Sequence, residues 1–169
     1  MKKLLTCLLV VCVINQAQSQ IYISEDFSSN QMPPAGWSID NNTEQWTIED
    51  ENAAGGTAPE ARFSYVDEVG VSRLISPSID LSSVSSVTLI FEHYFQNYST
   101  RIPKVGVATR SNGGDWNLVW ELVTSGDWGP ETKYIFIDNE DLGSSDFQFC
   151  LFVEGNFYLM EYWHLDNIE

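Results

Sequence analysis

The stretch Val87-Thr88-Leu89-Ile90-Phe91-Glu92-His93-Tyr94-Phe95 decides the fold class of this 169-residue chain. Side chains of a β-strand point alternately to opposite faces of the sheet. The residues that share one face are Val87, Leu89, Phe91, His93 and Phe95. Such an apolar face predicts a strand that packs on a core. On that face, His93 is interpreted as a hydrogen-bonded core histidine rather than as a catalytic base.

Short apolar and aromatic runs recur on both sides of this stretch, separated by Gly, Asn, Asp, Ser and Pro clusters, and no segment keeps a helical period. The turn sequence Ser111-Asn112-Gly113-Gly114-Asp115 predicts a hairpin. The pattern indicates an all-β, two-sheet antiparallel sandwich. The expected strands are 21–27, 45–48, 61–65, 73–75, 87–95, 104–109, 117–122, 132–137, 147–153 and 162–168.

The first 19 residues predict a secretory signal peptide. Lys2 and Lys3 precede an apolar run from Leu4 to Ile14, and small residues follow at Ala17 and Ser19. We therefore expect a signal peptide at residues 1–19, one domain at residues 20–169, and a secreted or cell-surface location. Cleavage would leave a single cysteine, Cys150, inside an apolar run, and this residue is interpreted as a buried small hydrophobe.

The charge balance excludes two classes of partner. The chain has 24 Asp and Glu against 8 Lys and Arg, a net charge of -16 and a pI near 4.2. Nucleic acids and anionic lipid surfaces would both repel such a domain. The apolar run at the N-terminus is too short to span a bilayer, and we expect no transmembrane segment after cleavage. A hydrophobic content of 43% is too high for a disordered acidic tail.

The last seven residues, Trp163 to Glu169, alternate like a strand and then stop without a turn. We expect the domain to be truncated in its final strand. A short final strand is the alternative.

Several short motifs, taken in order, resemble the cleaved-adhesin or choice-of-anchor J domains of secreted Bacteroidetes proteins, which are similar to MAM-type jelly rolls. The resemblance implies a two-sheet jelly roll of the MAM or galactose-binding-like type. It also implies a non-catalytic module that binds extracellular protein or glycan beside other domains of the same polypeptide. The matching motifs are Glu25-Asp26-Phe27, Pro33-Pro34-Ala35-Gly36-Trp37, Trp46, Ala61 to Tyr65, Leu74 to Leu81, Leu89 to Tyr94, and Leu165 to Ile168.

No catalytic motif is complete in the sequence. A sandwich glycosidase motif of the form Glu-x-Asp-x-x-Glu is matched only in its second half, by Asp166 and Glu169, because His164 stands at the first Glu position. The nucleophile elbow Gly-x-Ser-x-Gly and the zinc motif His-Glu-x-x-His do not occur. We expect no enzyme activity. The alternative is a secreted carbohydrate-active enzyme or its carbohydrate-binding module, and a structural spacer is a third possibility.

The acidic composition is compatible with a calcium site, because Ca²⁺ prefers carboxylate and carbonyl oxygens. The resemblance implies that Ca²⁺ ties the first strand to the last, and the matching positions are Glu25, Asp26 and Asp166. The oxygen-rich loop from Asp40 to Glu44 is a second candidate. The alternative for each acid is a solvated surface carboxylate.

Aromatic residues in polar loops are candidates for ligand contact. Trp128 and Tyr98 both lie between turn-forming residues. Their rings suit stacking on sugars and anchoring of a protein partner equally well. The alternative is that each ring merely plugs its loop.

Overall fold

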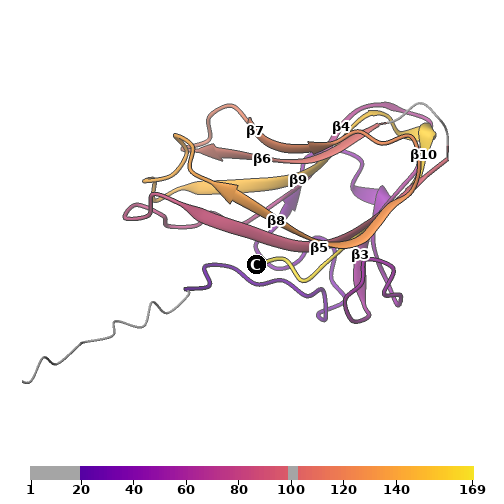
Figure 1. Cartoon of the computed structure of the whole chain (residues 1–169), viewed down its shortest axis with the longest axis horizontal. Coiled ribbons are helices and arrows are strands. Elements are labelled where there is room, and N and C mark those ends of the chain that lie inside the picture. The colour runs from indigo at the N-terminus through magenta and orange to yellow at the C-terminus, as the bar shows by residue number, and fades with distance from the viewer. Residues whose placement is uncertain (1–19, 99–102) are drawn as a thin grey trace, which may run out of the picture.

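Two five-stranded antiparallel sheets pack face to face in this computed structural model, which describes residues 20–98 and 103–169 (Figure 1). The predicted all-β sandwich is confirmed, whereas the predicted signal peptide lies outside the described residues. The first sheet has the order β1 (Ser38–Ile39), β4 (Val69–Ile75), β9 (Phe147–Asn156), β6 (Lys104–Ser111), β7 (Asn117–Leu122). The second sheet has the order β2 (Trp46–Glu49), β3 (Glu60–Ser64), β10 (Met160–Asp166), β5 (Val87–Asn97), β8 (Trp128–Ile137).

The alternation in β5 forms the core as the sequence predicts. Leu89, Phe91, His93 and Phe95 are buried between the sheets, whereas the residues between them are partly exposed. Phe91 packs edge-on against Trp120 of the opposite sheet, with ring centroids 5.9 Å apart. The two sheets are therefore joined by one aromatic core.

Strand β10 occupies the centre of the second sheet. It pairs with β3 through Trp163 opposite Phe63, and with β5 through Trp163 opposite Phe95. Trp163 and Leu165 are fully buried in the core between the sheets. Because strand side chains alternate, Tyr162, His164 and Asp166 lie on the outer face of the same strand.

The predicted hairpin joins β6 to β7. Asn112 and Gly113 both adopt positive φ angles, 52° and 67°, and Gly114 N–H donates to the carbonyl of Ser111 at 2.9 Å. Asn and Gly are the residues that tolerate this left-handed backbone. The turn chemistry read from the sequence is thus the turn that forms.

The predicted first strand, 21–27, is wrong as a continuous strand. Only Glu25 pairs there, and it exchanges two 2.9 Å backbone hydrogen bonds with Ile168. The backbone turns away at Phe27, whose φ is 56°. The expected strand 117–122 forms with its predicted bounds, the other expected strands form with one or both ends shifted, and the two-residue strand β1 was not predicted.

Two further side chains, Trp37 and Cys150, are buried, and the burial of Cys150 agrees with its interpretation from the sequence. Trp37 is buried and meets the Phe149 ring edge-on at 5.6 Å, as a structural tryptophan. Cys150 is fully buried, on the outer side of the first sheet beside Ala108 and Phe152. Burial raises the pKa of its thiol to about 12, so the sulfur stays protonated and unreactive.

Among residues 20–98 and 103–169, no helix has the length and apolarity needed to cross a membrane.

We predict that Phe91→Ala lowers the free energy of unfolding by about 3–5 kcal/mol, because it removes a fully buried ring and leaves a cavity. Leu118→Ala, at a side chain that is 58% exposed, should change it by about 0.5 kcal/mol or less. Urea unfolding measures both. Similar costs for the two variants would contradict the core described above.

Candidate functional site

The outer face of β10 carries a row of polar and aromatic side chains, Tyr162, His164 and Asp166, that the core does not use. The imidazole of His164 lies 5.8 Å from the ring of Tyr162 and 6.0 Å from the ring of Tyr94 on β5, centroid to centroid. From β3, the guanidinium of Arg62 stacks on Tyr162 at 4.5 Å. Three adjacent strands thus build one continuous surface strip.

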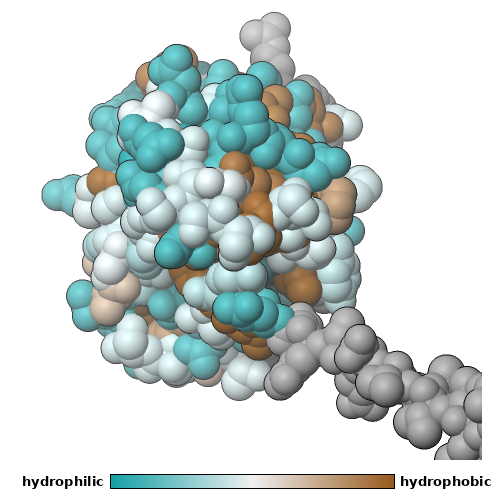
Figure 2. Space-filling view, turned by 90° about the vertical axis from the view of Figure 1, so that its left-hand side faces the viewer, coloured by the Kyte–Doolittle hydropathy of each residue, from teal (hydrophilic) through white to brown (hydrophobic). Residues whose placement is uncertain are grey.

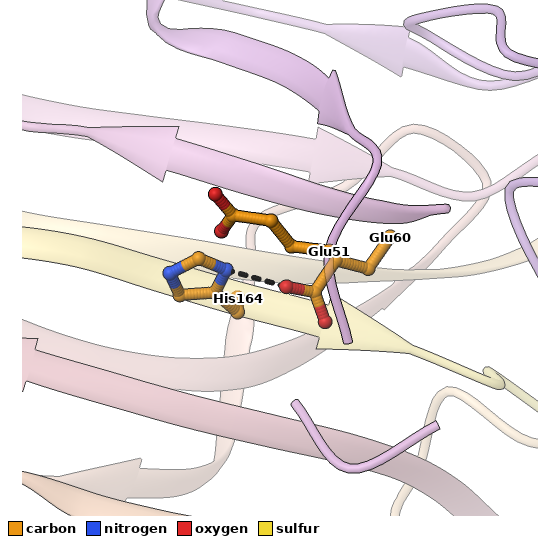
Figure 3. A group of neighbouring side chains, drawn as sticks. All are labelled: Glu51, Glu60 and His164. Atoms are coloured by element: carbon orange, nitrogen blue, oxygen red, sulfur yellow. Dashed lines mark hydrogen bonds and ion pairs between the residues drawn. The ribbon is translucent and has the colours of Figure 1, made fainter. Parts of the chain in front are cut away.

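A buried hydrogen-bonded pair, Glu60 and His164, lies in the middle of this strip. Glu60 Oε1 lies 2.7 Å from His164 Nδ1, across the β3–β10 pair (Figure 3). The same carboxylate accepts the backbone N–H groups of Ala53 and Ala54 at 3.0 and 2.8 Å. Burial alone would raise the pKa of Glu60, but these donors and His164 outweigh it and hold the pKa below its usual range. Glu60 therefore fastens the loop between β2 and β3 onto the sheet.

Glu51 completes a group of three possible metal ligands with Glu60 and His164. One ligand atom from each residue lies within 4.8 Å of the others, and Figure 3 shows the Glu51 carboxylate extending over the imidazole. However, Glu60 and His164 already bind each other, and Glu60 also accepts two backbone hydrogen bonds. A metal ion here would have to break the pair that holds the loop. The arrangement is therefore explained by loop anchoring.

Asp166 lies at the end of the strip in an acidic environment. Its carboxylate is buried and accepts the backbone N–H groups of Thr57 at 3.0 Å and Asn167 at 2.8 Å. Burial raises the pKa of Asp166 to about 6, helped by the negative charges of Glu92 and Glu60, although the two N–H donors lower it. The negative charge at this position is thus incompletely compensated.

The loop before β3 closes over this acidic group. A side chain on Gly56 would collide with the carboxylates of Asp166 and Glu92 and with the amide of Asn167. The Asn167 amide also donates to Glu92 Oε2 at 3.0 Å. The carboxylates of Asp166 and Glu92 therefore converge with the amide nitrogen of Asn167 under a glycine backbone. The two carboxylates are ligands that suit a hard cation such as Ca²⁺.

The structure brings the segments around Glu25 and Ile168 together, but it does not gather all three predicted metal ligands. Glu25 pairs with Ile168, two residues beyond Asp166. Its carboxylate accepts the N–H of Phe27 at 2.8 Å, and that of Asp26 accepts Ser28 O–H at 2.6 Å. The Ser28 donors lower the pKa of Asp26. Glu92 and Glu60, rather than Glu25 and Asp26, are the acids that act on Asp166.

His93 is a buried core histidine held by hydrogen bonds, in agreement with the interpretation from the sequence. Trp163 Nε1 donates to its Nδ1 at 3.4 Å, and its Nε2 lies 3.1 Å from Glu131 Oε1. Burial lowers the pKa of His93, although Glu131 opposes this. Trp128, a predicted ligand contact, is 43% exposed and donates its indole N–H to the same Glu131 oxygen at 2.9 Å.

Tyr98, the other predicted ligand contact, belongs to an exposed group of three tyrosines. Tyr158 meets Tyr98 at 5.9 Å and Tyr65 at 6.3 Å, in both cases edge to face. The exposed fractions of Tyr65, Tyr98 and Tyr158 are 52%, 61% and 46%. We call these residues the tyrosine cluster. The hydrogen bond from Asn97 N–H to Asp127 Oδ1, 2.9 Å long, holds the turn before Trp128 against the strand end that carries Tyr98.

Several of these residues were not predicted as site residues. Tyr65 ends an apolar run and was counted as part of a strand, and Glu60 and Glu92 gave no motif. Their partners are distant in sequence: 104 positions separate Glu60 from His164. Only the strand pairing reveals such contacts.

No protein-family model matches this sequence, and no curated protein matches it at a significant level. Solved structures do match. The carbohydrate-binding module TmCBM61, solved with β-1,4-galactotriose, has a TM-score of 0.61 and 18% identity, over 89% of this chain and 97% of that one. The K1 cleaved adhesin domain of Lys-gingipain from Porphyromonas gingivalis W83 has a TM-score of 0.60 and 17% identity, over 86% of this chain and 95% of that one. A carbohydrate-binding module specific for non-crystalline cellulose, CBM28, has a TM-score of 0.51 and 15% identity, over 85% of this chain and 91% of that one.

These likenesses establish the fold. The chain is a jelly-roll β-sandwich of the kind found in carbohydrate-binding modules and in cleaved adhesin domains.

The raised pKa of Asp166 predicts a specific pH dependence of stability. A carboxyl group whose pKa rises from 3.8 unfolded to about 6 folded costs stability when it ionises. That cost is absent below pH 3.8, grows between pH 3.8 and 6, and is complete above pH 6. In chelator, Asp166→Asn should therefore melt higher than the wild type at pH 7.5 and equal to it at pH 4. A melting difference that stays constant from pH 4 to 7.5 would contradict the assignment.

Proposed function

We propose that this chain is a non-catalytic extracellular binding module. The resemblance to cleaved-adhesin, choice-of-anchor J and MAM-like domains supports an adhesive role beside other domains of one polypeptide. The signal peptide predicted at residues 1–19 supports secretion or display at the cell surface, where the ligand is a glycan or a protein.

The tyrosine cluster carries this proposal. Three rings, each 46% exposed or more, hold one another edge to face at one end of the sandwich. Their mutual contacts reduce the entropy lost when a ligand orders them, and each ring retains an apolar face and a hydroxyl group. Rigid amphipathic aromatic surfaces of this kind bind sugar rings and protein hot spots. Trp128 is a further exposed aromatic residue, and it follows the turn that Asp127 holds against the end of β5.

The two histidines support a non-catalytic role. The chain contains only His93 and His164, and their exposed fractions are 0% and 2%. His93 is enclosed by Trp163 and Glu131, and His164 is bound to Glu60. Neither imidazole reaches a surface where a substrate could approach within hydrogen-bonding distance.

The alternative function is a carbohydrate-binding module or catalytic domain of a carbohydrate-active enzyme, favoured by the structural likeness to TmCBM61. Sugar binding alone does not distinguish the proposals, because a glycan-binding module and an enzyme both bind sugar. Turnover identifies a catalytic domain. Assays on chromogenic glycosides and polysaccharides should detect no product, and a rate that is lost on replacing Asp166 would overturn the non-catalytic proposal.

We predict that Tyr98→Ala and Tyr158→Ala each weaken ligand binding about tenfold, equivalent to about 1.4 kcal/mol, because each removes a stacking ring. Affinity electrophoresis in β-1,4-galactan and non-crystalline cellulose measures glycan binding, and immobilised extracellular-matrix proteins test the protein alternative. Thermal melting should be nearly unchanged because both rings are exposed.

Tyr134→Ala is the matched control, since Tyr134 is 67% exposed but lies on β8, outside the tyrosine cluster. It should retain wild-type binding. Equal losses in all three variants, or no loss in any, would refute the role of the tyrosine cluster.

We further propose that Ca²⁺ stabilises the fold at Asp166, the expected cofactor position. The uncompensated charge at Asp166 and the nearby carboxylate of Glu92 support this position. Glu25 and Asp26 remain proposed ligands from the resemblance, although their carboxylates cap local turns.

Ca²⁺ added to chelated protein should raise the melting temperature, since a ligand present at a hundred times its Kd adds about 2.7 kcal/mol. Asp166→Asn and Glu92→Gln should abolish this response. Asp26→Asn separates the two ligand sets, because it should retain the response if Glu92 is the second ligand. If titration calorimetry and melting both show no response to Ca²⁺ in the wild type, the site does not exist.

A further inference from the structure

A groove of about 510 Å³ opens at one end of the sandwich, between the N-terminal segment 20–23 and the start of β5. Its floor is made by the core side chains Leu81, Leu89, Phe147 and Phe149. Figure 2 looks onto this end and shows apolar surface between polar side chains. Ile21 and Phe136, at its rim, are 61% and 63% exposed. Apolar side chains of the core therefore border the groove, and exposed apolar side chains form part of its rim.

The N-terminal segment and β5 form the two walls of the groove, and each wall is hydrogen-bonded to one of the last two residues of the chain. On one wall, Glu25 and Ile168 exchange both backbone hydrogen bonds, each 2.9 Å. On the other wall, Ile90 and Glu169 do the same, again at 2.9 Å. Figure 1 shows the C-terminal segment between β5 and the N-terminal segment, where these bonds place it.

Antiparallel pairing repeats every second residue, so the next backbone groups that face the groove are those of Ile23 and Thr88. Within residues 20–98 and 103–169, neither has a backbone partner on that side. Both walls thus offer one donor and one acceptor at corresponding positions, in line with the bonds that Ile168 and Glu169 already make to the two walls.

The register also fixes the chemistry of the occupant. Ile168 points into the core and Glu169 points outward, with Ile168 fully buried and Glu169 exposed. The first and third residues of a strand that extends this line would therefore enter the apolar floor, and the second and fourth would face solvent.

We propose that this groove is an acceptor site for one further β-strand, an extended segment joined to β10 through Glu169. The strand runs antiparallel to β5, pairs with Thr88 on one side and Ile23 on the other, and is apolar at its first and third positions. It closes the core at this end of the sandwich. The proposal rests on the two unpaired walls and the apolar floor, and it is independent of ligand binding at the tyrosine cluster.

The test uses two extensions of equal composition, Val-Thr-Val-Thr and Thr-Val-Thr-Val, appended after Glu169. The first places valine in the groove, whereas the second shifts every side chain to the opposite face. We expect the first to raise the melting temperature by about 4 °C or more. Amide exchange at Ile23 and Thr88 should slow at least tenfold with the first extension only. Thr88→Pro, which removes one wall donor, should reduce the gain.

Equal melting shifts for both extensions, or unchanged exchange at Ile23 and Thr88, would overturn the proposal. Two further measurements address other occupants. If free Val-Thr-Val-Thr peptide at equimolar concentration gives the same shift, or if light scattering shows that the extended chain exchanges strands in a dimer, the joined strand is not the occupant.

Discussion

The insertion of β10 between β3 and β5 is the constraint on which the rest of the structure depends. Its inward residues, Trp163 and Leu165, fill the centre of the core. Its outward residues build the strip that runs from Tyr162 to Asp166, and its continuation to Ile168 and Glu169 joins both chain ends to the second sheet. A slip of one residue would bury His164 and Asp166 in the core and expose Trp163, because strand side chains alternate strictly between faces. The surface chemistry and the apolar core are therefore set by the same pairing.

Much of the fold could be predicted from the sequence because its signals are local. The alternation in β5 and the Asn112-Gly113 turn depend on neighbouring residues only, and both form as expected. The first predicted strand failed because Glu25 alone pairs in that segment, and no local pattern shows that its neighbours lack a partner strand. The left-handed backbone at Phe27 then ends the segment, and an apolar aromatic side chain gives no warning of a positive φ. Of the site, Tyr98 was found because it stands in a polar loop. Tyr65, Glu60 and Glu92 were missed because their roles arise from partners brought near by strand pairing, which no local pattern encodes.

The acidic residues differ in how their negative charge is compensated. Glu49 pairs with Arg62 at 2.7 Å, and Asp40 pairs with Arg73 at the same distance, so the few basic residues neutralise only some acids. Asp26 and Asp80 are capped by serine donors, which lower the pKa of each carboxyl group. Asp166 is different, because burial and neighbouring acids raise its pKa although two N–H groups bind it. Among these acids, Asp166 is therefore the candidate position for a cation, where the end of β10 meets the loop that contains Gly56.

Hydrogen exchange measured strand by strand tests the central position of β10 most directly. If the second sheet depends on the pairing of β10 with both β3 and β5, the amides of Trp163 and Leu165 should exchange only through global unfolding. Their opening free energy should then equal the free energy of unfolding from urea, while the edge strands β2 and β7 open at lower cost. Exchange of Trp163 and Leu165 through a local opening as easy as that of β2 or β7 would contradict the account.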